Sequence, residues 1–307
     1  MRAIGISRTG DLSVLEQRSL PVPVPQADEV LLKCEWAGVN FIDTYQRSGL
    51  YALPLPLTLG QESAGRVVAL GEGEASDGTL KLGDKVAAYV GGSFAEYVVA
   101  PRSKVVKLPE GLETRDAATA LLQGLTGEFG YLCPPRRMAS YLGATVIGTV
   151  STAAKASLAQ AAGATHLINY ADASVSVADE VARLTHGAGV AAIFDGVGKD
   201  TWEDDFKMIA RKGTIVTFGN ASGAVPAFAP LKLAAKNVKV CRPTLGNYVY
   251  TREETERYAA ELFALLAQHK LTLRVHQEYA FSVEGVRQAQ EDIAGRGTTG
   301  KLIVKVA

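Results

Sequence analysis

The sequence predicts an α/β protein in which a β-rich module is split by an inserted domain with a doubly wound parallel sheet. Three observations support this prediction. Residues 1 to about 110 alternate short apolar runs with Gly and Pro, which is typical of a β-rich module. From Thr145 onward, short apolar runs alternate with helix-length segments, which is the pattern of a parallel sheet. The final apolar run, Lys301–Val306, has no helix after it and is expected to return to the first module.

The strands expected in the β-rich module are short and are separated by turn residues. Pro21, Pro23 and Pro25 predict an extended linker, because the residue before a proline is kept out of the helical region. The expected strands of this module are Val30–Trp36, Lys85–Tyr89 and Ala95–Val99.

The inserted domain is expected to alternate strands with helices. Gly163 and Gly187 follow two helix-length segments and are expected to end them, because glycine adopts the left-handed conformation that closes a helix. The expected helices are Ala153–Ala162 and Val175–Thr185. The expected strands are Thr145–Val150, His166–Asn169, Ala191–Phe194, Thr214–Phe218 and Val238–Cys241.

An amphipathic helix is expected directly after Tyr250. Thr251 and Glu254 have the spacing of a capping box at its start. We interpret the apolar stripe on one face of this helix as core packing. The stripe consists of Tyr258, Leu262, Leu265 and Leu266.

The composition excludes several classes of function. Acidic and basic residues balance at 32 each, which argues against nucleic-acid binding driven by net charge. No apolar run reaches membrane-spanning length, and the first residues lack the apolar core of a secretory signal. The three cysteines are widely spaced, so we interpret them as buried thiols in a reducing compartment and expect a soluble, cytoplasmic protein. The four histidines are scattered, and none forms a pair with metal-ligand spacing.

The end of the expected strand Thr145–Val150 carries a cofactor signal. An NAD-binding sheet places an acid at this position to bind the ribose 2′-hydroxyl, whereas a cation suits a 2′-phosphate. This chain has no carboxylate there and has a cation one helical turn in, so the residues predict NADPH. A solvated helix residue is the alternative interpretation of Lys155. The segment reads Ser151, Thr152, Ala153, Ala154 and Lys155.

A glycine-rich phosphate turn is absent from its expected place. Gly187–Ala192 and Gly295–Gly300 approach the G-x-G-x-x-G pattern, but each leads into a strand rather than out of one. The five expected strands are one short of the usual six, and the missing strand 1 normally carries this turn. Upstream of the first expected strand lies only the stretch 127–137. Phe129–Cys133 is its one candidate for a substitute strand, and Pro134-Pro135 cannot donate N–H groups to phosphate.

Two segments, Gly38–Tyr51 and Leu59–Glu62, resemble the zinc-free quinone oxidoreductase branch of the medium-chain dehydrogenases and reductases, the zeta-crystallin-like NADPH:quinone reductases. Zinc-dependent relatives have a Cys and a His at the places of Asn40 and Gln61, whose neutral amides are poor zinc ligands. The resemblance therefore implies that no metal is bound.

The resemblance covers nearly the whole chain. It implies a GroES-like domain at 1–121 and 247–307 and a Rossmann-type NADPH-binding domain at 122–246. It breaks between Thr126 and Met138, where roughly twenty residues are missing, including the first Rossmann strand and the family's A-A-G-G-V-G turn. We therefore expect the first Rossmann strand and the glycine turn to be deleted.

The resemblance also implies where the cofactor binds. Phe41, Ile42 and Asp43 are expected to line the nicotinamide side, and Tyr170 and Arg296 to face the 2′-phosphate. A surface aromatic is the alternative interpretation of Tyr170. The remaining implied cofactor contacts are Val197, Gly219, Asn220, Ala221, Ser222, Pro243, Thr244 and Leu245.

Four residues are expected to face the acceptor. We predict that Asn40 and Tyr45 hydrogen-bond its carbonyl, and that Tyr51 and Gln61 shape the pocket wall. For Asn40 and Tyr45 the alternative is that the side chain satisfies buried backbone groups.

Hydride transfer is the chemistry that these residues favour. No nucleophile motif and no Cys–His signature is present, and hydride transfer needs proximity more than an acid–base pair. We expect a homodimeric, NADPH-dependent reductase of small-molecule quinones. The alternatives are a reductase of α,β-unsaturated carbonyls, a non-catalytic, crystallin-like binding or structural protein, and an altered or mis-joined product of an otherwise ordinary reductase. Loss of the glycine turn is expected to weaken NADPH binding and to slow quinone reduction.

Overall fold

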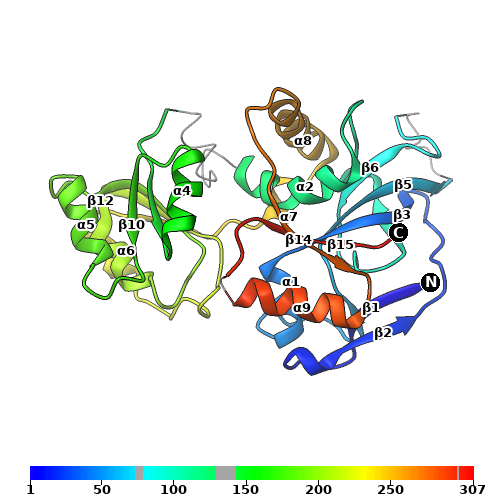
Figure 1. Ribbon diagram of the computed structural model, residues 1–307, viewed down its shortest axis with the longest axis horizontal. Coiled ribbons are helices and arrows are strands. Elements are labelled where there is room, and N and C mark those ends of the chain that lie inside the picture. The colour runs from blue at the N-terminus through cyan, green and yellow to red at the C-terminus, as the bar shows by residue number, and fades with distance from the viewer. Residues whose placement is uncertain (73–78, 129–142, 296) are drawn as a thin grey trace. The chain divides into compact units, whose positions relative to one another are not determined.

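The computed structural model describes residues 1–72, 79–128, 143–295 and 297–307 (Figure 1). The chain divides into two compact units. The first consists of Met1–Leu125 with Val249–Ala307, and the second of Thr126–Tyr248. These boundaries lie close to those expected at 121/122 and 246/247. A β-rich unit, interrupted in the sequence by a unit with parallel strands, confirms the expected α/β fold class.

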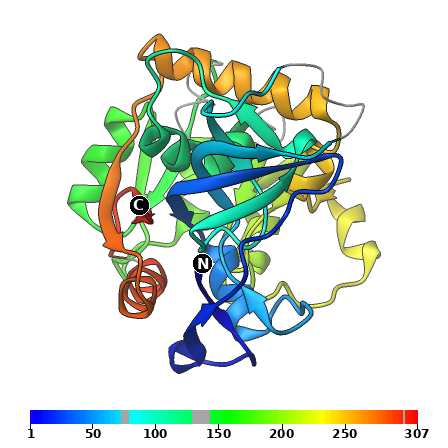
Figure 2. The ribbon, with the colours of Figure 1, turned by 90° about the vertical axis from the view of Figure 1, so that its right-hand side faces the viewer.

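The first unit is built around a seven-stranded, largely antiparallel sheet (Figure 2). Strand β3 (Glu29–Val39) lies inside this sheet and pairs with three other strands. These are β5 (Glu62–Leu70), β7 (Tyr97–Pro101) and β15 (Lys301–Lys305). The pairing of β15 with β3 confirms that the final strand returns to the first module. The sheet also holds β6 (Lys85–Tyr89), β8 (Val105–Lys107) and β14 (Val275–Ala280), and a three-stranded sheet holds β1 (Arg2–Ile6), β2 (Leu15–Ser19) and β4 (Leu57–Thr58).

Strand β3 takes part in two separate cores. Val30 and Leu32 belong to a cluster near the start of the strand, and Ala37 and Val39 belong to another near its end. Covering by apolar side chains along most of its length explains why the strand carries a nearly continuous apolar sequence. Asn40 follows directly after Val39 of the second core.

Four helices of eight residues or more belong to the described part of the first unit. At the start of α8 (Arg252–Ala267), Thr251 and Glu254 form the expected capping box. Leu262 and Leu266 of the predicted stripe are buried in this helix, as expected for core packing. The other three helices were not expected from the sequence. They are α1 (Phe41–Ser48), α2 (Thr114–Glu128) and α9 (Val283–Ala294).

The second unit contains two parallel sheets. Strand β9 (Ile147–Val150) pairs with β10 (His166–Asn169). A three-stranded sheet holds β11 (Val190–Asp195), β12 (Ile209–Thr217) and β13 (Lys239–Cys241). The connecting helices are α4 (Ala153–Ala161), α5 (Val177–Leu184) and α6 (Trp202–Met208), and α7 (Leu245–Tyr248) follows β13.

The two sheets match a doubly wound sheet that is interrupted at its centre. In the strand order 3-2-1-4-5-6, β10 and β9 take places 3 and 2, and β11, β12 and β13 take places 4, 5 and 6. Within the described ranges no strand occupies place 1 between β9 and β11. The candidate substitute strand Phe129–Cys133 and the Pro134-Pro135 pair lie outside the described residues.

The two sheets of this unit differ in how much apolar surface they bury. Beside β11–β13, Trp202, Ile209, Ile215 and Val238 form a buried cluster. The buried cluster beside β9 and β10 consists of the smaller side chains Val150, Ala159 and Ala164. Because stability grows with buried apolar area, at about 25 cal/mol per Å², the β9–β10 part has the weaker core.

Some strand ends differ from the expected ones because long-range pairing decides them. Strand β12 begins at Ile209 rather than at Thr214, since Ile209 pairs with Val190 of β11. Strand β7 spans Tyr97–Pro101 rather than Ala95–Val99, since Ala95 bridges instead to Ala3.

The thiols only partly match expectation. Cys34 is buried, and burial raises the pKa of its thiol. Cys241 is half-buried rather than buried because it lies on β13, at the edge of its sheet. Cys133 lies outside the described residues. None of the helices in the described ranges is long and apolar enough to span a membrane.

Candidate functional site

The start of α1 is held by reciprocal contacts between two residues that were expected to be functional. The backbone N–H of Asn40 donates to Oδ2 of Asp43 at 2.8 Å, and the backbone N–H of Asp43 donates to the carbonyl of Asn40 at 3.0 Å. Asp43 is fully buried, while Phe41 and Ile42 in the first turn stay half-buried. The first turn therefore has a fixed polar side and an accessible apolar side.

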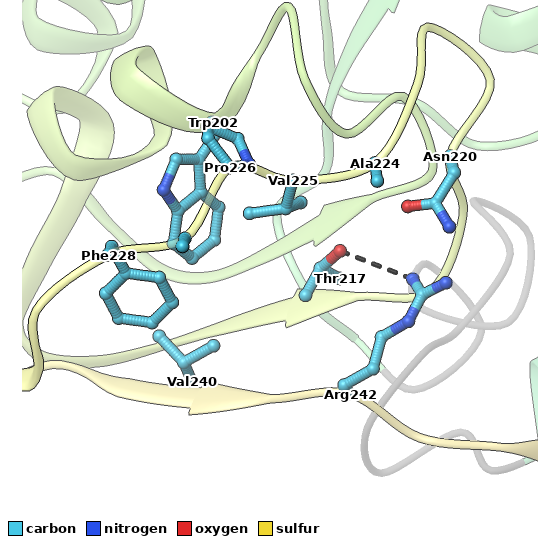
Figure 3. A pocket seen from close by; sticks show the side chains of 10 residues that line it. Trp202, Thr217, Asn220, Ala224, Val225, Pro226, Phe228, Val240 and Arg242 are labelled. Carbon is cyan, nitrogen blue, oxygen red and sulfur yellow. Dashed lines mark hydrogen bonds between the residues drawn. The ribbon is translucent and has the colours of Figure 1, made fainter.

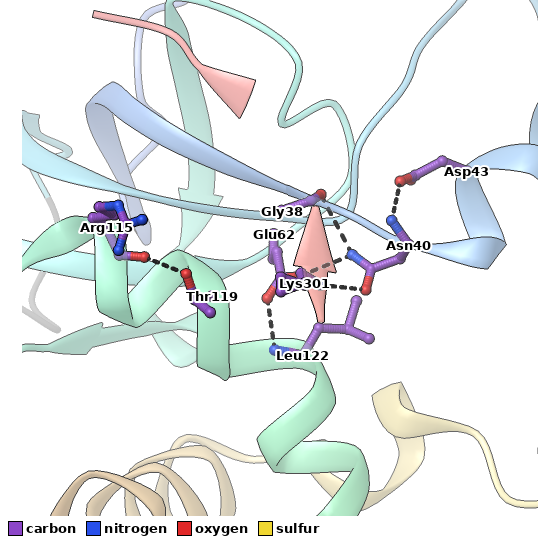
Figure 4. A network of polar contacts seen from close by, with 8 residues as sticks. All are labelled: Gly38, Asn40, Asp43, Glu62, Arg115, Thr119, Leu122 and Lys301. Carbon is purple, nitrogen blue, oxygen red and sulfur yellow. Dashed lines mark hydrogen bonds and ion pairs between the residues drawn. The ribbon is translucent and has the colours of Figure 1, made fainter. Parts of the chain in front are cut away.

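Asn40 belongs to a buried polar network with Glu62 and Lys301 (Figure 4). The Lys301 ammonium donates to Oδ1 of Asn40 at 2.7 Å and also to Oε1 of Glu62. Nδ2 of Asn40 donates to the same Glu62 oxygen at 2.8 Å. The second Glu62 oxygen accepts the backbone N–H of Leu122, in α2, at 2.7 Å. We call Asn40, Glu62 and Lys301 the buried network.

These contacts bear on the expected role of Asn40. Its oxygen is engaged by Lys301, and its nitrogen by Glu62 and by a longer 3.4 Å contact with the carbonyl of Gly38. The amide is thus engaged mainly by two charged side chains, and among the described residues its only contact with a backbone group, the alternative expected from the sequence, is the longer one to Gly38.

Asp43 has an unusual protonation equilibrium. Burial raises the pKa of its carboxyl from an ordinary value of 3.8 to about 7. The N–H of Asn40 and the charge of Lys301 act in the opposite direction, and the charge of Glu62 adds to the rise. The carboxyl therefore changes its charge near neutral pH.

The predicted pocket-wall residues lie in the same unit as α1. Tyr45 is buried, and its ring lies edge-on to Tyr51, with 5.2 Å between ring centroids. The ring centroid of Phe41 lies 6.3 Å from that of Tyr45. Gln61 is half-buried, and its Nε2 donates to Oε1 of Gln46 at 3.3 Å. Phe41, Tyr45 and Tyr51 thus form one aromatic cluster.

In the second unit, the predicted cofactor residues follow the carboxyl ends of the parallel strands. After β9, Thr152 caps α4 by accepting the backbone N–H of Lys155 at 3.2 Å. The ammonium of Lys155 lies 3.2 Å from the hydroxyl of Ser151. Ala153 and Ala154 are exposed between them. This turn carries hydroxyls, helix N–H groups and a cation, which together suit an anionic group.

The other predicted contacts follow the neighbouring strands. Tyr170 comes after β10 and is 45% exposed. The remaining described residues of this set follow β11, β12 and β13 in turn: Val197, then Gly219, Asn220, Ala221 and Ser222, then Pro243, Thr244 and Leu245. The carboxyl ends of parallel strands form the ligand-binding edge of such sheets. Arg296 lies outside the described residues.

The loops after β11 and β12 are locked to each other. The hydroxyl of Ser222 donates to the carbonyl of Val197 at 2.9 Å. The Asp195 carboxylate accepts the backbone N–H of Val197 at 2.7 Å. A Cβ at Gly219 would lie 2.3 Å from the carbonyl oxygen of Gly196, so only glycine permits this close approach. These two loops are therefore preorganised by the chain itself.

An open hollow of about 500 Å³ lies beside β12 and β13 (Figure 3). Its apolar end holds Trp202 and Phe228, whose ring centroids are 4.9 Å apart. At its polar end the Arg242 guanidinium donates to the hydroxyl of Thr217 at 3.3 Å. Of the predicted site residues, only Asn220 lines this hollow. The sequence analysis did not predict this hollow, although aromatic residues recur in the segments that form it.

Zinc does not fit the residues at the places where zinc-dependent relatives hold it. Asn40 and Gln61 carry amides there, and the amide of Asn40 is already engaged. In the described ranges, no group of three or more His, Cys, Asp or Glu side chains is arranged to hold a metal ion.

Glu62 and Lys301 were missed in the sequence, although each leaves a signal. Lys301 begins the apolar strand Lys301–Lys305, and Glu62 begins β5, whose next residues are small and buried. A charged residue that opens a buried strand needs a partner, because an unpaired buried charge is costly.

Comparisons with known proteins agree on one family. Residues 26–110 match the family model of the alcohol dehydrogenase GroES-like domain, and residues 137–264 match that of the zinc-binding dehydrogenases. A quinone oxidoreductase of Pseudomonas aeruginosa is 37% identical, over 99% of both chains. The structure of an Escherichia coli quinone oxidoreductase complexed with NADPH matches with a TM-score of 0.93 and 32% identity, over 100% of both chains. A 2-haloacrylate reductase of a Burkholderia species is 29% identical, over 91% of both chains.

The length of one alignment can be compared with the length of this chain. The alignment with the Pseudomonas aeruginosa relative runs over 329 positions, whereas this chain has 307 residues. At least 22 aligned positions therefore hold no residue of this chain. This number is close to the roughly twenty residues that we expect to be missing, while their place between Thr126 and Met138 stays a prediction.

The raised pKa of Asp43 makes a testable contribution to stability. Between about pH 4 and pH 7 the folded state keeps a proton on this carboxyl that the unfolded state has lost, so stability should fall as the pH rises through this window. Asp43→Asn removes this loss, on the order of 3 kcal/mol. In thermal unfolding measured from pH 4 to pH 8, the unfolding midpoint of the variant should therefore rise relative to that of the parent chain as the pH rises.

Asp11→Asn is the matched control for this measurement. Hydrogen bonds from Ser13 lower the pKa of the exposed Asp11 carboxyl, so its contribution has the opposite sign. Parallel stability curves for the Asp43 variant and the parent chain would show that Asp43 titrates normally.

Proposed function

Because this chain belongs to the quinone oxidoreductase family of the medium-chain dehydrogenases and reductases, we propose that it is an NADPH-dependent reductase of small quinones that works without zinc. NADPH supplies the hydride when it is bound. The residues of this chain bind and orient the cofactor and the acceptor, which is the main requirement for hydride transfer.

The turn after β9 is the observation that carries the proposed cofactor. Lys155, Ser151 and Thr152 converge at the start of α4, and no carboxylate lies in this turn. A 2′-phosphate would meet a cation, two hydroxyls and the helix N-terminus here. The exposed Tyr170 follows the adjacent strand β10, and we propose that it completes the phosphate site.

We propose that the acceptor binds beside α1. Phe41 and Ile42 offer apolar surface to a planar ring, and Tyr45 offers a hydroxyl for hydrogen bonding the acceptor carbonyl. The amide of Asn40 is engaged in the buried network, so we assign it to holding α1 rather than to contacting the acceptor. Tyr51 and Gln61 complete the wall of this pocket.

Reduction of α,β-unsaturated carbonyl compounds is the second candidate. The 29% identity with a 2-haloacrylate reductase favours it, because a 2-haloacrylate is an activated alkene that accepts a hydride at carbon. Turnover of 1,4-benzoquinone and of 2-chloroacrylate at equal NADPH concentration distinguishes the two activities.

We also propose that the shortened second unit binds NADPH weakly. The break that we expect between Thr126 and Met138 would remove a strand and a glycine turn that present N–H groups to the pyrophosphate. The described residues include those proposed to bind the ribose 2′-phosphate and the loops after β11, β12 and β13. They include no strand between β9 and β11. Weak binding would also explain a non-catalytic role, which was the third interpretation.

The first test concerns Lys155. A charge-assisted hydrogen bond is worth roughly 1.5–3 kcal/mol, so Lys155→Ala should weaken NADPH binding by about ten- to a hundred-fold. NADH binding should hardly change. Fluorescence titration should be made in a chain with a family-type strand and glycine turn inserted, where affinities are in a measurable range. Lys239→Ala, which removes an exposed charge of the same unit, is the control. Equal loss for both cofactors would make Lys155 a structural residue.

The second test concerns the break itself. Two or three missing charge-assisted hydrogen bonds cost on the order of 3–6 kcal/mol. From a micromolar affinity of about 8 kcal/mol, NADPH binding should fall to near or beyond millimolar. Titration of the chain beside its strand-restored variant measures this difference. Micromolar affinity and ordinary turnover in the parent chain would contradict the proposal.

We propose that the protein is a homodimer. In the described ranges, β13 has a partner strand on one side only, and the nearby Leu231 is 81% exposed. An unpaired strand edge beside apolar surface favours association with a second copy. Sedimentation velocity should give twice the chain mass of 32.4 kDa, and a mass of one chain at micromolar concentration would contradict the proposal.

A further inference from the structure

We infer that Lys301 and Glu62 are positioning residues, whose buried ion pair holds Asn40 and thereby sets the place of the first turn of α1. The inference rests on the proposed function, because α1 carries the residues that we place beside the acceptor. It concerns a pair of buried charges that we do not place in contact with the acceptor.

The ion pair is fully removed from solvent. The side chains of Lys301 and Glu62 are 2% and 0% exposed. Burying two charges is costly, and two apolar side chains of similar size often serve stability equally well. Stability alone therefore does not account for the pair, and its geometry points to a role in fixing structure.

The network joins four segments that are distant in the sequence. Lys301 opens β15, Glu62 opens β5, Asn40 follows β3, and Leu122 belongs to α2. Both β5 and β15 pair with β3 close to Asn40, through Ser63 with Ala37 and through Leu302 with Val39. The two charges thus converge on the residue where β3 turns into α1.

The backbone around the network is shaped to admit Glu62. A Cβ on Gly38 would lie 2.2 Å from Oε1 of Glu62. Glycine at this position therefore lets the carboxylate lie across β3 and reach Asn40 and Lys301. A side chain at 38 would displace the one oxygen that both donors share.

Fixing Asn40 also fixes the side chains that follow it. Lys301 donates to Oδ1 of Asn40, which leaves Nδ2 facing Glu62 and settles the orientation of the amide. The backbone N–H of Asn40 is bound by Asp43 in the first turn of α1. Phe41 and Ile42 lie between these two anchored residues, and Tyr45 lies one turn further on. A shift of the anchor would move all three.

The test replaces the pair in two steps. Lys301→Met alone leaves the Glu62 charge buried and unpaired, so the thermal unfolding midpoint should fall strongly. Adding Glu62→Met removes that charge, and the double variant should recover most of the loss. Its α1 amides (Phe41–Ser48) should still exchange hydrogen at least about tenfold faster than in the parent chain, while those of α8 should be unchanged. Its kcat/KM for 1,4-benzoquinone should remain about tenfold lower.

Lys85→Met with Glu113→Met is the matched control, because this ion pair of the same unit is partly exposed and worth little. It should change neither the exchange of α1 nor kcat/KM. A double variant of the buried pair that recovers both the unfolding midpoint and the exchange of α1 would overturn the inference. The exchange measurement needs no turnover, so it tests the inference even if the protein does not reduce quinones.

Glu62→Gln covers the case in which the double variant does not fold. It keeps the shape of the side chain and one acceptor oxygen but removes the charge that holds Lys301. Faster exchange in α1 with unchanged exchange in α8 supports the inference. Unchanged exchange in α1 overturns it.

Discussion

Backbone pairing along β3 is the constraint on which the first unit depends. This strand pairs with β5, β7 and β15, so it joins the beginning of the unit to the segment that follows the insert. Its end leads into α1, and the two strands that flank this end deliver Glu62 and Lys301. The half-buried first turn of α1 therefore lies where three paired strands meet. The chemistry proposed for the unit therefore depends on strand register more than on any loop.

The second unit shows which parts of a nucleotide-binding sheet are independent. The loops after β11 and β12 hold each other through Ser222, Val197 and Asp195. The turn after β9 is organised by its own cap, Thr152. Each of these turns at the ligand-binding edge of the sheet is therefore held by its own contacts or by those with its neighbour. The strand at place 1 would join these elements into one sheet, and its pairing has no local substitute between β9 and β11 in the described ranges.

Local patterns predicted the fold better than the site. Strand and helix alternation placed β9 to β13, and the Thr251–Glu254 spacing identified the start of α8. The buried network escaped prediction because its contacts are not local, and the bond from Lys301 to Asn40 spans 261 positions of sequence. The residue types at the turn after β9 revealed a cation without a carboxylate, but the geometry of α1 required the structure. Arg296 and Phe129–Cys133 lie outside the described residues, so the expectations for them stay predictions.

The order in which a ribosome makes the chain gives the return of β15 a further consequence. Strand β3 and Glu62 leave the ribosome well before β15 exists, while the whole insert Thr126–Tyr248 is made between them. Until Lys301 arrives, Glu62 has no ammonium to balance its charge, and β3 has an open edge where β15 will pair. The first unit therefore stays incomplete throughout most of synthesis. The nascent chain must protect that edge from other strands until its own last strand closes it.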